Sequence, residues 1–146
     1  MPMQRLVNSI EKGLVIDHIR AGLGVKLFHY LKLDEADFTV VIVCNAESKR
    51  MGRKDIIKIQ NIIDLDYTVI GLIDHNSTIS VIENGVITSK RQMTLPHRVE
   101  NVILCKNPRC VTSAEPLLPH VFHLQNAETR TYRCAYCENH VRGIEI

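Results

Sequence analysis

Four cysteines in two close pairs are the side chains of this 146-residue chain best suited to chemistry. Cys105 and Cys110 enclose four residues, and Cys134 and Cys137 enclose two. Zn²⁺ binds four thiolate or imidazole ligands in a tetrahedron, and two short loops can supply two ligands each. Four protein ligands leave no position for an activated water. The spacing therefore predicts one zinc ion per chain with a structural, non-catalytic role.

Four unrelated thiols and two disulfides are the alternatives to a zinc site. The first residues lack the pattern of a signal peptide, and no apolar run is long enough to cross a bilayer, so we expect a cytoplasmic chain without membrane contact. Disulfides are rare in that compartment, which favours a metal site. Three histidines could compete as ligands, although four cysteines already complete the shell: His120, His123 and His140.

Lysines in the first half of the chain suit a phosphate-bearing ligand. Lys54 and Lys58 are four residues apart, so they share a face in a strand or a helix. On a strand their Cα atoms would lie ~13 Å apart, a span comparable to a nucleoside triphosphate. Lys90 could add a third positive group. A solvated polar surface is the alternative interpretation of these lysines.

Asp17 and His18 are adjacent, and a carboxylate next to an imidazole could suggest an acid–base pair. Adjacent residues of an extended strand point to opposite faces, so the two side chains should not form a general acid–base dyad. Asp17 is better suited to accept hydrogen bonds from a ribose, as an acidic residue does in dinucleotide-binding folds.

The elements that must position these groups are predicted from periodicity and turn residues. The order of strands and helices favours an α+β protein whose first domain is a ferredoxin-like sandwich, one sheet covered on one face by two helices. Asn84-Gly85 indicates a hairpin turn. The expected strands are Leu14–Ile19, Phe38–Cys44, Lys54–Gln60, Thr78–Ile82 and Val86–Thr88, the expected helix is Val25–Leu33, and Asp64–Asp74 fits a strand or a short helix.

The strand expected over Phe38–Cys44 is apolar on both faces, which is typical of a central buried strand, with Cys44 as a small buried residue. The chain changes character near Leu95-Pro96, after which four of the five cysteines occur. We therefore expect two domains, residues 1–97 and a small β-rich zinc-binding domain over residues 98–146. The second has few large apolar residues, so metal binding should be its main source of stability.

Several motifs in this order resemble the regulatory chain of aspartate carbamoyltransferase. The resemblance covers nearly the whole chain and rests on Gly13–Ile19, Met51–Ile59, Leu95–Val102, Ala114-Glu115-Pro116 and the four cysteines. It implies a non-catalytic subunit in which an allosteric domain binds CTP or ATP and a zinc domain contacts the catalytic chain. It also implies a dimer of regulatory chains within an assembly of six catalytic and six regulatory chains, serving pyrimidine biosynthesis.

The resemblance also implies roles for individual residues of the nucleotide site. Asp17 and Lys58 would contact the ribose and base region, and His18, Lys54 and Lys90 would lie near the phosphates. The remaining residues would approach the base or line the pocket: Val7, Asn8, Ser9, Ile10, Val15, Ser80, Ile82 and Ile87. The family often has Glu, Asn and Tyr where this chain has Asn8, Ser80 and Gly85. These differences leave open which nucleotide binds best and whether it activates or inhibits.

Two other functions are considered. A zinc-ribbon protein that binds nucleic acid would use Arg130, Arg133 and Arg142, but nearby glutamates dilute their charge and aromatic residues make up only 5% of the chain. An enzyme acting on a phosphorylated substrate is disfavoured because the sequence offers no nucleophile–base set and no open metal position. We therefore expect no nucleic-acid partner and no catalytic activity.

Overall fold

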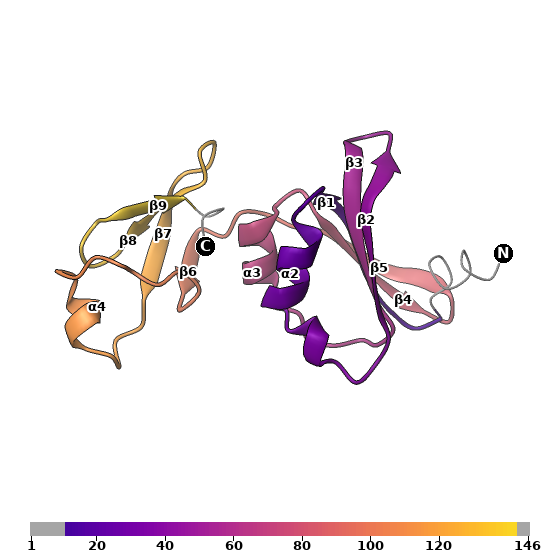
Figure 1. Ribbon diagram of the computed structural model, residues 1–146, viewed down its shortest axis with the longest axis horizontal. Helices are drawn as coiled ribbons and strands as arrows, with labels where there is room; N and C mark the ends of the chain where they lie inside the picture. Colours follow the sequence, from indigo (N-terminus) through magenta and orange to yellow (C-terminus); the bar gives the residue numbers. More distant parts are fainter. Residues whose placement is uncertain (1–10, 143–146) are drawn as a thin grey trace. The chain divides into compact units, whose positions relative to one another are not determined.

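A computed structural model describes residues 11–142 of the chain, which divide into two compact units at the boundary between Thr94 and Leu95. Figure 1 shows the course of the chain through both units. The first unit combines one sheet with helices, and the second is mostly sheet. This arrangement confirms the predicted α+β class with a small β-rich second part.

The first unit contains a five-stranded antiparallel sheet in the order β2-β3-β1-β4-β5. Two helices, α2 and α3, lie together on one face of this sheet (Figure 1). The order β1-α2-β2-β3-α3-β4 and the strand arrangement confirm the ferredoxin-like sandwich, to which the hairpin adds β5. The elements are β1 (Gly13–Arg20), α2 (Gly24–Tyr30), a 3-10 turn (Leu33–Glu35), β2 (Val40–Ser48), β3 (Gly52–Ile59), α3 (Tyr67–Ile73), β4 (Thr78–Glu83) and β5 (Val86–Gln92).

The ambiguous stretch Asp64–Asp74 contains helix α3. Asp66 caps its start, because the carboxylate accepts hydrogen bonds from the N–H groups of Thr68 and Val69. Such a cap satisfies donors that have no partner within the helix. Ile70 and Ile73 then pack against the sheet. The cap and this apolar face prevail over the strand propensity of the β-branched residues.

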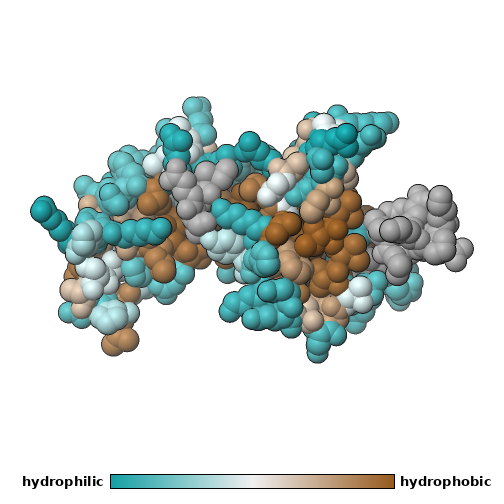
Figure 2. Space-filling model, viewed as in Figure 1, coloured by the Kyte–Doolittle hydropathy of each residue, from teal (hydrophilic) through white to brown (hydrophobic). Residues whose placement is uncertain are grey.

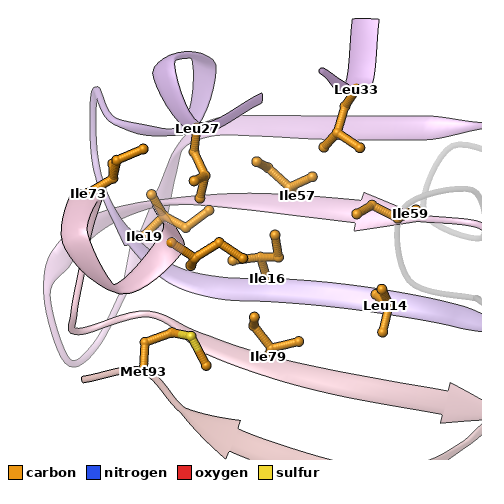
Figure 3. Close-up of a cluster of buried hydrophobic side chains, with 11 residues drawn as sticks. Leu14, Ile16, Ile19, Leu27, Leu33, Ile57, Ile59, Ile73, Ile79 and Met93 are labelled. Atoms are coloured by element: carbon orange, nitrogen blue, oxygen red, sulfur yellow. The ribbon is translucent and has the colours of Figure 1, made fainter. Parts of the chain in front are cut away.

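The core of the first unit lies between the sheet and the helices. Figure 3 shows apolar side chains of β1, β3 and β4 gathered beneath Leu27 of α2 and Ile73 of α3. On β1, Leu14, Ile16 and Ile19 are almost completely buried. The cluster as a whole consists of Leu14, Ile16, Ile19, Leu27, Leu33, Ile57, Ile59, Ile70, Ile73, Ile79 and Met93.

Strand β2 lies at the edge of the sheet, so the prediction of a central strand is wrong. Residues Val40–Val43 are half-buried rather than buried, and Cys44 is exposed, contrary to the expectation for that residue. Figure 2 shows apolar surface over the part of the first unit where β2 runs in Figure 1. An edge strand that is apolar on both faces has the same sequence pattern as a central one, because periodicity does not report which neighbours are present.

Two strands of the first sheet carry a β-bulge beside the same part of β3. The register of β1 against β3 shifts between Ile16 and Ile19, and that of β2 shifts between Val43 and Ala46. Each bulge contains a residue in the left-handed region, His18 at φ 59° and Asn45 at φ 60°. Bulges bend a strand and change the direction in which its side chains point.

The second unit is built on a four-stranded antiparallel sheet in the order β6-β7-β8-β9. Its small core includes Val99, Phe122 and Tyr132. The Tyr132 hydroxyl donates a hydrogen bond to the carbonyl of Pro96 at 2.7 Å, and burial raises the pKa of Tyr132 to about 12. The elements are β6 (Arg98–Glu100), α4 (Val111–Ala114), β7 (Val121–Asn126), β8 (Thr131–Cys134) and β9 (His140–Arg142).

Among residues 11–142, no helix is both long and apolar enough to cross a membrane.

Candidate metal centre and ligand face

The second unit brings the four cysteines of the two predicted pairs into one cluster. Their sulfur atoms all lie within 4.8 Å of one another. The Sγ atoms of Cys105 and Cys137 are 3.6 Å apart, and those of Cys110 and Cys134 are 3.8 Å apart. A tetrahedron with four metal–sulfur bonds of about 2.3 Å has edges of about 3.8 Å. The donor set and its spacing therefore fit one tetrahedral metal ion.

Local turns shape the two cysteine loops. In the first loop, the Asn107 side chain accepts a hydrogen bond from the N–H of Arg109, and its carbonyl accepts one from the N–H of Cys110. In the second loop, the carbonyl of Cys134 accepts a hydrogen bond from the N–H of Glu138, which lies in the left-handed region at φ 64°. These turns fold each pair of cysteines toward a common point.

Neighbouring polar groups hold the cysteines without joining the cluster. The Nδ1 atom of His120 accepts a hydrogen bond from the N–H of Cys105 at 2.9 Å, and the Thr112 hydroxyl donates one to Cys110 Sγ at 3.2 Å. His120 therefore orients a ligand loop, as outer groups around metal sites do. His123 and His140 are exposed on their strands.

The sulfur atoms of the cluster differ in acidity. Burial raises the pKa of Cys105 to about 12. Burial also acts to raise the pKa of Cys137, but hydrogen bonds from Asn107 and from the N–H of Asn139 outweigh it and lower that pKa to about 7. Metals bind thiolates rather than thiols. A bound cation would therefore offset the negative charge of the thiolates in this cluster.

The face of the first sheet that is turned away from the helices carries the lysines of the predicted ligand site. Directly paired residues of antiparallel strands point to the same face. Lys58 pairs with Val15, Val15 with Ser80, and Ser80 with Lys90, so these four residues form one row across β3, β1, β4 and β5. We call this side of the sheet the outer face, since Ile57, Ile16 and Ile79 occupy the helix side. Ile82 and Ile87 pair directly with each other on the same face.

The bulge in β1 overturns the expectation that Asp17 and His18 point to opposite faces. Asp17 pairs with Thr78 on the outer face, and the His18 Nδ1 atom lies 3.0 Å from the Thr78 hydroxyl. The left-handed backbone at His18 thus brings both side chains to the outer face. Their hydrogen bonds go to other groups, Asp17 to Lys54 and His18 to Thr78, and the two side chains form no mutual hydrogen bond.

Asp17 is held as a carboxylate. Burial acts to raise its pKa, but an ion pair with Lys54 at 3.0 Å and a hydrogen bond from the N–H of His18 at 2.6 Å outweigh it, so the pKa of Asp17 lies below its ordinary value. Lys54 is thereby oriented across β3 and β1 toward the outer face. This pair places one cation and one strong acceptor next to each other.

Lys58 is unusually buried for a lysine, with 9% of its surface exposed. Burial lowers the pKa of Lys58, and the charge of Asp17 partly opposes that effect. Lys90, by contrast, is exposed on β5. The outer face therefore has a partly desolvated cation on β3 and a solvated one on β5.

Four of the predicted site residues, Val7, Asn8, Ser9 and Ile10, lie outside the described residues. Two residues that the sequence did not single out contact the segments that form this face. Thr78 contacts His18, and Asp55 lies beside Lys54 in β3, with its carboxylate buried on the helix side. No motif marks either one. The pairing of strands, which the sequence does not display, is the only signal for both.

Both units of the chain match domains of the same protein family. The allosteric domain of the aspartate carbamoyltransferase regulatory chain matches residues 5–94, and the metal binding domain of that chain matches residues 97–146. The aspartate carbamoyltransferase regulatory chain of Clostridium botulinum is 53% identical over 140 residues, covering 96% of both chains. That of Clostridium acetobutylicum is 50% identical, covering 94% of both, and that of Bifidobacterium longum is 44% identical, covering 93% of this chain and 98% of its own.

Metal removal should unfold the second unit before the first. Metal binding contributes ~10–16 kcal/mol to small thiolate domains, whereas the apolar core of this unit is small. Addition of a strong chelator to the metal-loaded chain should therefore abolish amide protection in residues 98–142 while β1, β3 and β4 stay protected, as measured by hydrogen exchange with mass spectrometry. Equal protection of the second unit with and without chelator would contradict this expectation.

Acid should weaken the first unit through Asp17. The pKa of Asp17 is lowered in the folded chain, so its contribution to stability is complete above the unfolded pKa of about 3.9 and is lost as the pH falls through the folded pKa. Asp17→Asn should make the free energy of unfolding of the first unit less dependent on pH below about pH 4. Urea titrations at several pH values measure this. The same slope in both proteins would refute it.

Proposed function

Because the chain belongs to the family of aspartate carbamoyltransferase regulatory chains, we propose that it binds CTP and ATP on the outer face of its first sheet and passes their effect to catalytic chains through a zinc-stabilised second unit. As a regulatory chain it is a non-catalytic subunit whose partner is a catalytic chain.

The row Lys58–Val15–Ser80–Lys90 is the observation that carries the nucleotide proposal. Three strand spacings separate Lys58 from Lys90, about 14 Å, which suits the length of a nucleoside triphosphate. Ammonium groups bind phosphates in varied geometry. Lys90, Lys54 and His18 would lie near the phosphates, with Asp17 and Lys58 at the ribose and base.

Apolar side chains support the same placement of the base. Val15 lies within the lysine row, and the Ile82–Ile87 pair lies next to it on the outer face. Ile87 is 61% exposed, so a planar base would cover surface that otherwise faces water. The residues at positions 7–10 would reach the base mainly through backbone groups, as the family resemblance implies.

Zinc is the metal that fits the sulfur cluster best. Four thiolates in a tetrahedron are typical of structural Zn²⁺ sites, and no fifth ligand is offered by the described residues nearby. Cys105, Cys110, Cys134 and Cys137 would hold the ion. When bound, the ion supplies only structural stability, because its four positions are filled by protein. Reduced thiols of this kind also agree with a cytoplasmic location.

The loops that carry the cysteines offer a docking surface for the catalytic chain. Leu117 is 97% exposed, and Leu104, Val111 and Tyr136, each adjacent to a cysteine, are 57%, 44% and 40% exposed. Apolar side chains gathered around rigid loops are typical of protein–protein contacts. We propose that metal binding shapes these loops for the catalytic chain.

The free edge of β2 supports a pair of regulatory chains. Among residues 11–142, no strand lies beside β2 on the side away from β3, and Val40–Val43 are apolar and half-buried. A second copy of the chain pairing there would cover this edge. Such pairs would link catalytic trimers into an assembly of six catalytic and six regulatory chains. A nucleotide could then shift the activity only by binding two quaternary states with different affinity.

A nucleic-acid partner is not favoured by the second unit. Arg98 is paired with Glu100 at 3.1 Å, and Arg133 lies 3.9 Å from Glu138. These acidic groups reduce the positive potential that binding to a phosphate backbone requires.

Lys58→Ala should weaken binding of both CTP and ATP by roughly tenfold or more, because a charge-assisted contact contributes about 1.5–3 kcal/mol. Assembly with catalytic trimers should persist, since Lys58 lies on the outer face of the first unit. Calorimetric titration measures the affinities, and sedimentation velocity measures the assembly. Lys49→Ala, an exposed lysine at the β2–β3 hairpin, is the matched control. Unaltered nucleotide affinity in Lys58→Ala would refute the proposed site.

Leu117→Asp should weaken association with catalytic trimers without loss of metal, because it places a charge in the proposed apolar contact. Cys134→Ser should abolish both metal binding and association. Sedimentation of mixtures with catalytic trimers, together with metal analysis, measures each effect. Val25→Asp, at a 47% exposed position of α2, should leave association unchanged. Normal holoenzyme formation by both second-unit variants would count against this docking surface.

A further inference from the structure

Asp55 is a buried carboxylate that gathers three backbone N–H groups from two separate segments. Its exposed fraction is 1%. Oδ1 accepts a hydrogen bond from Asn45 of β2 at 2.8 Å, and Oδ2 accepts two from the turn between β1 and α2, Gly22 at 3.0 Å and Gly24 at 2.9 Å. Three donors compensate the cost of burying this charge.

The turn after β1 is shaped around this carboxylate. A Cβ atom on Gly24 would lie 2.8 Å from both Cβ and Oδ2 of Asp55, which is closer than such atoms approach. Gly22 lies at φ 99°, a conformation that side chains disfavour. The N–H of Gly24 also opens helix α2 and has no acceptor within that helix. The two glycines allow the backbone to approach Asp55 on the helix side of the sheet.

The same carboxylate lies where both β-bulges end. After the bulge in β1, pairing with β3 resumes at Ile19 and Asp55, and after the bulge in β2 it resumes at Ala46 and Lys54. A bulge leaves one residue unpaired. In β2 the bulge lies between Val43 and Ala46 and includes Asn45, whose N–H donates a hydrogen bond to Asp55. Asp55 therefore holds the β2 bulge directly and anchors the end of β1 through the turn that follows it.

The β1 bulge is also the feature that turns Asp17 and His18 together onto the outer face. Lys54, which precedes Asp55, points to that face and pairs with Asp17 at 3.0 Å. One residue step in β3 thus joins two different sets of contacts. Lys54 pairs with Asp17 on the outer face. Asp55, on the opposite side of the sheet, accepts hydrogen bonds from the β2 bulge and from the turn after β1.

We propose that Asp55 is the positioning residue of the nucleotide site: it fixes the paired bulges of β1 and β2, and thereby presents Asp17, His18 and Lys54 to the ligand and links that site to the edge strand β2. The inference rests on the proposed function of the outer face. Asp55 does not touch the ligand, because its carboxylate lies on the helix side of the sheet.

Asp55→Asn is the variant that tests this role. An amide has one acceptor oxygen, so it must leave either Asn45 or the pair Gly22 and Gly24 without an acceptor and facing an N–H₂ group. The full-length, zinc-loaded chain with this change should bind CTP and ATP roughly tenfold more weakly by calorimetric titration. Amide exchange at Asn45 should become faster at the same time.

A double-mutant cycle separates positioning from general loss of stability. If Asp55 acts through the β1 bulge, Asp55→Asn should weaken binding by about threefold or less in an Asp17→Asn background, because the group that it positions is already altered. Asp66→Ala, which removes the cap of α3 elsewhere in the same unit, should lower stability without changing nucleotide affinity. Gly24→Ala displaces the carboxylate instead of removing it, and it carries the same test if Asp55→Asn does not fold.

Each outcome has a definite meaning. Weaker nucleotide binding that is not additive with Asp17→Asn supports the inference. Unchanged affinity in Asp55→Asn or Gly24→Ala, or an equal loss in both Asp17 backgrounds, overturns it while the proposed function stands. A wild-type chain that binds neither CTP nor ATP overturns both.

Discussion

The pairing of β1 with β3 on one side and with β4 on the other is the constraint on which the first unit depends. This register buries Ile16, Ile57 and Ile79 against the helices and, by the alternation of strand residues, turns Lys58, Val15 and Ser80 to the outer face. A shift of one residue would exchange the two sets. The apolar core therefore sets the positions of the charged groups, and burial of the core stabilises the arrangement of the ligand face.

Much of this arrangement follows from the sequence. A β-branched run located β1, helical periodicity located α2, and the Asn84-Gly85 turn located the β4–β5 hairpin. The order of elements predicted the sandwich. Periodicity could not reveal that β2 is an edge strand, because an apolar pattern on both faces says nothing about neighbours. It also missed the β1 bulge. A left-handed histidine within a strand has no sequence signature, and this conformation brought Asp17 and His18 to one face. Asp55 was missed for a related reason, since its three donors belong to residues distant in the chain.

The second unit relies on a different source of order. Its buried side chains are few, and the two cysteine loops meet around one point instead of around a large apolar cluster. Cysteine spacing alone was enough to predict that the four sulfurs converge, because short loops restrict where paired ligands can lie. The support that His120 and Thr112 give to the cysteines was not predictable in the same way. Their roles depend on backbone positions that only the folded sheet defines.

The partial burial of Lys58 has a consequence for how an anion would be received. An ammonium group that is already partly desolvated loses less hydration than a fully exposed one when a negatively charged oxygen approaches. Part of the free energy of desolvating this ammonium group is thus already spent when the sheet folds, whereas a solvent-exposed lysine must be desolvated when the anion binds. On this face, selectivity for an anion can arise from the partial desolvation of one cation as well as from the number of cations.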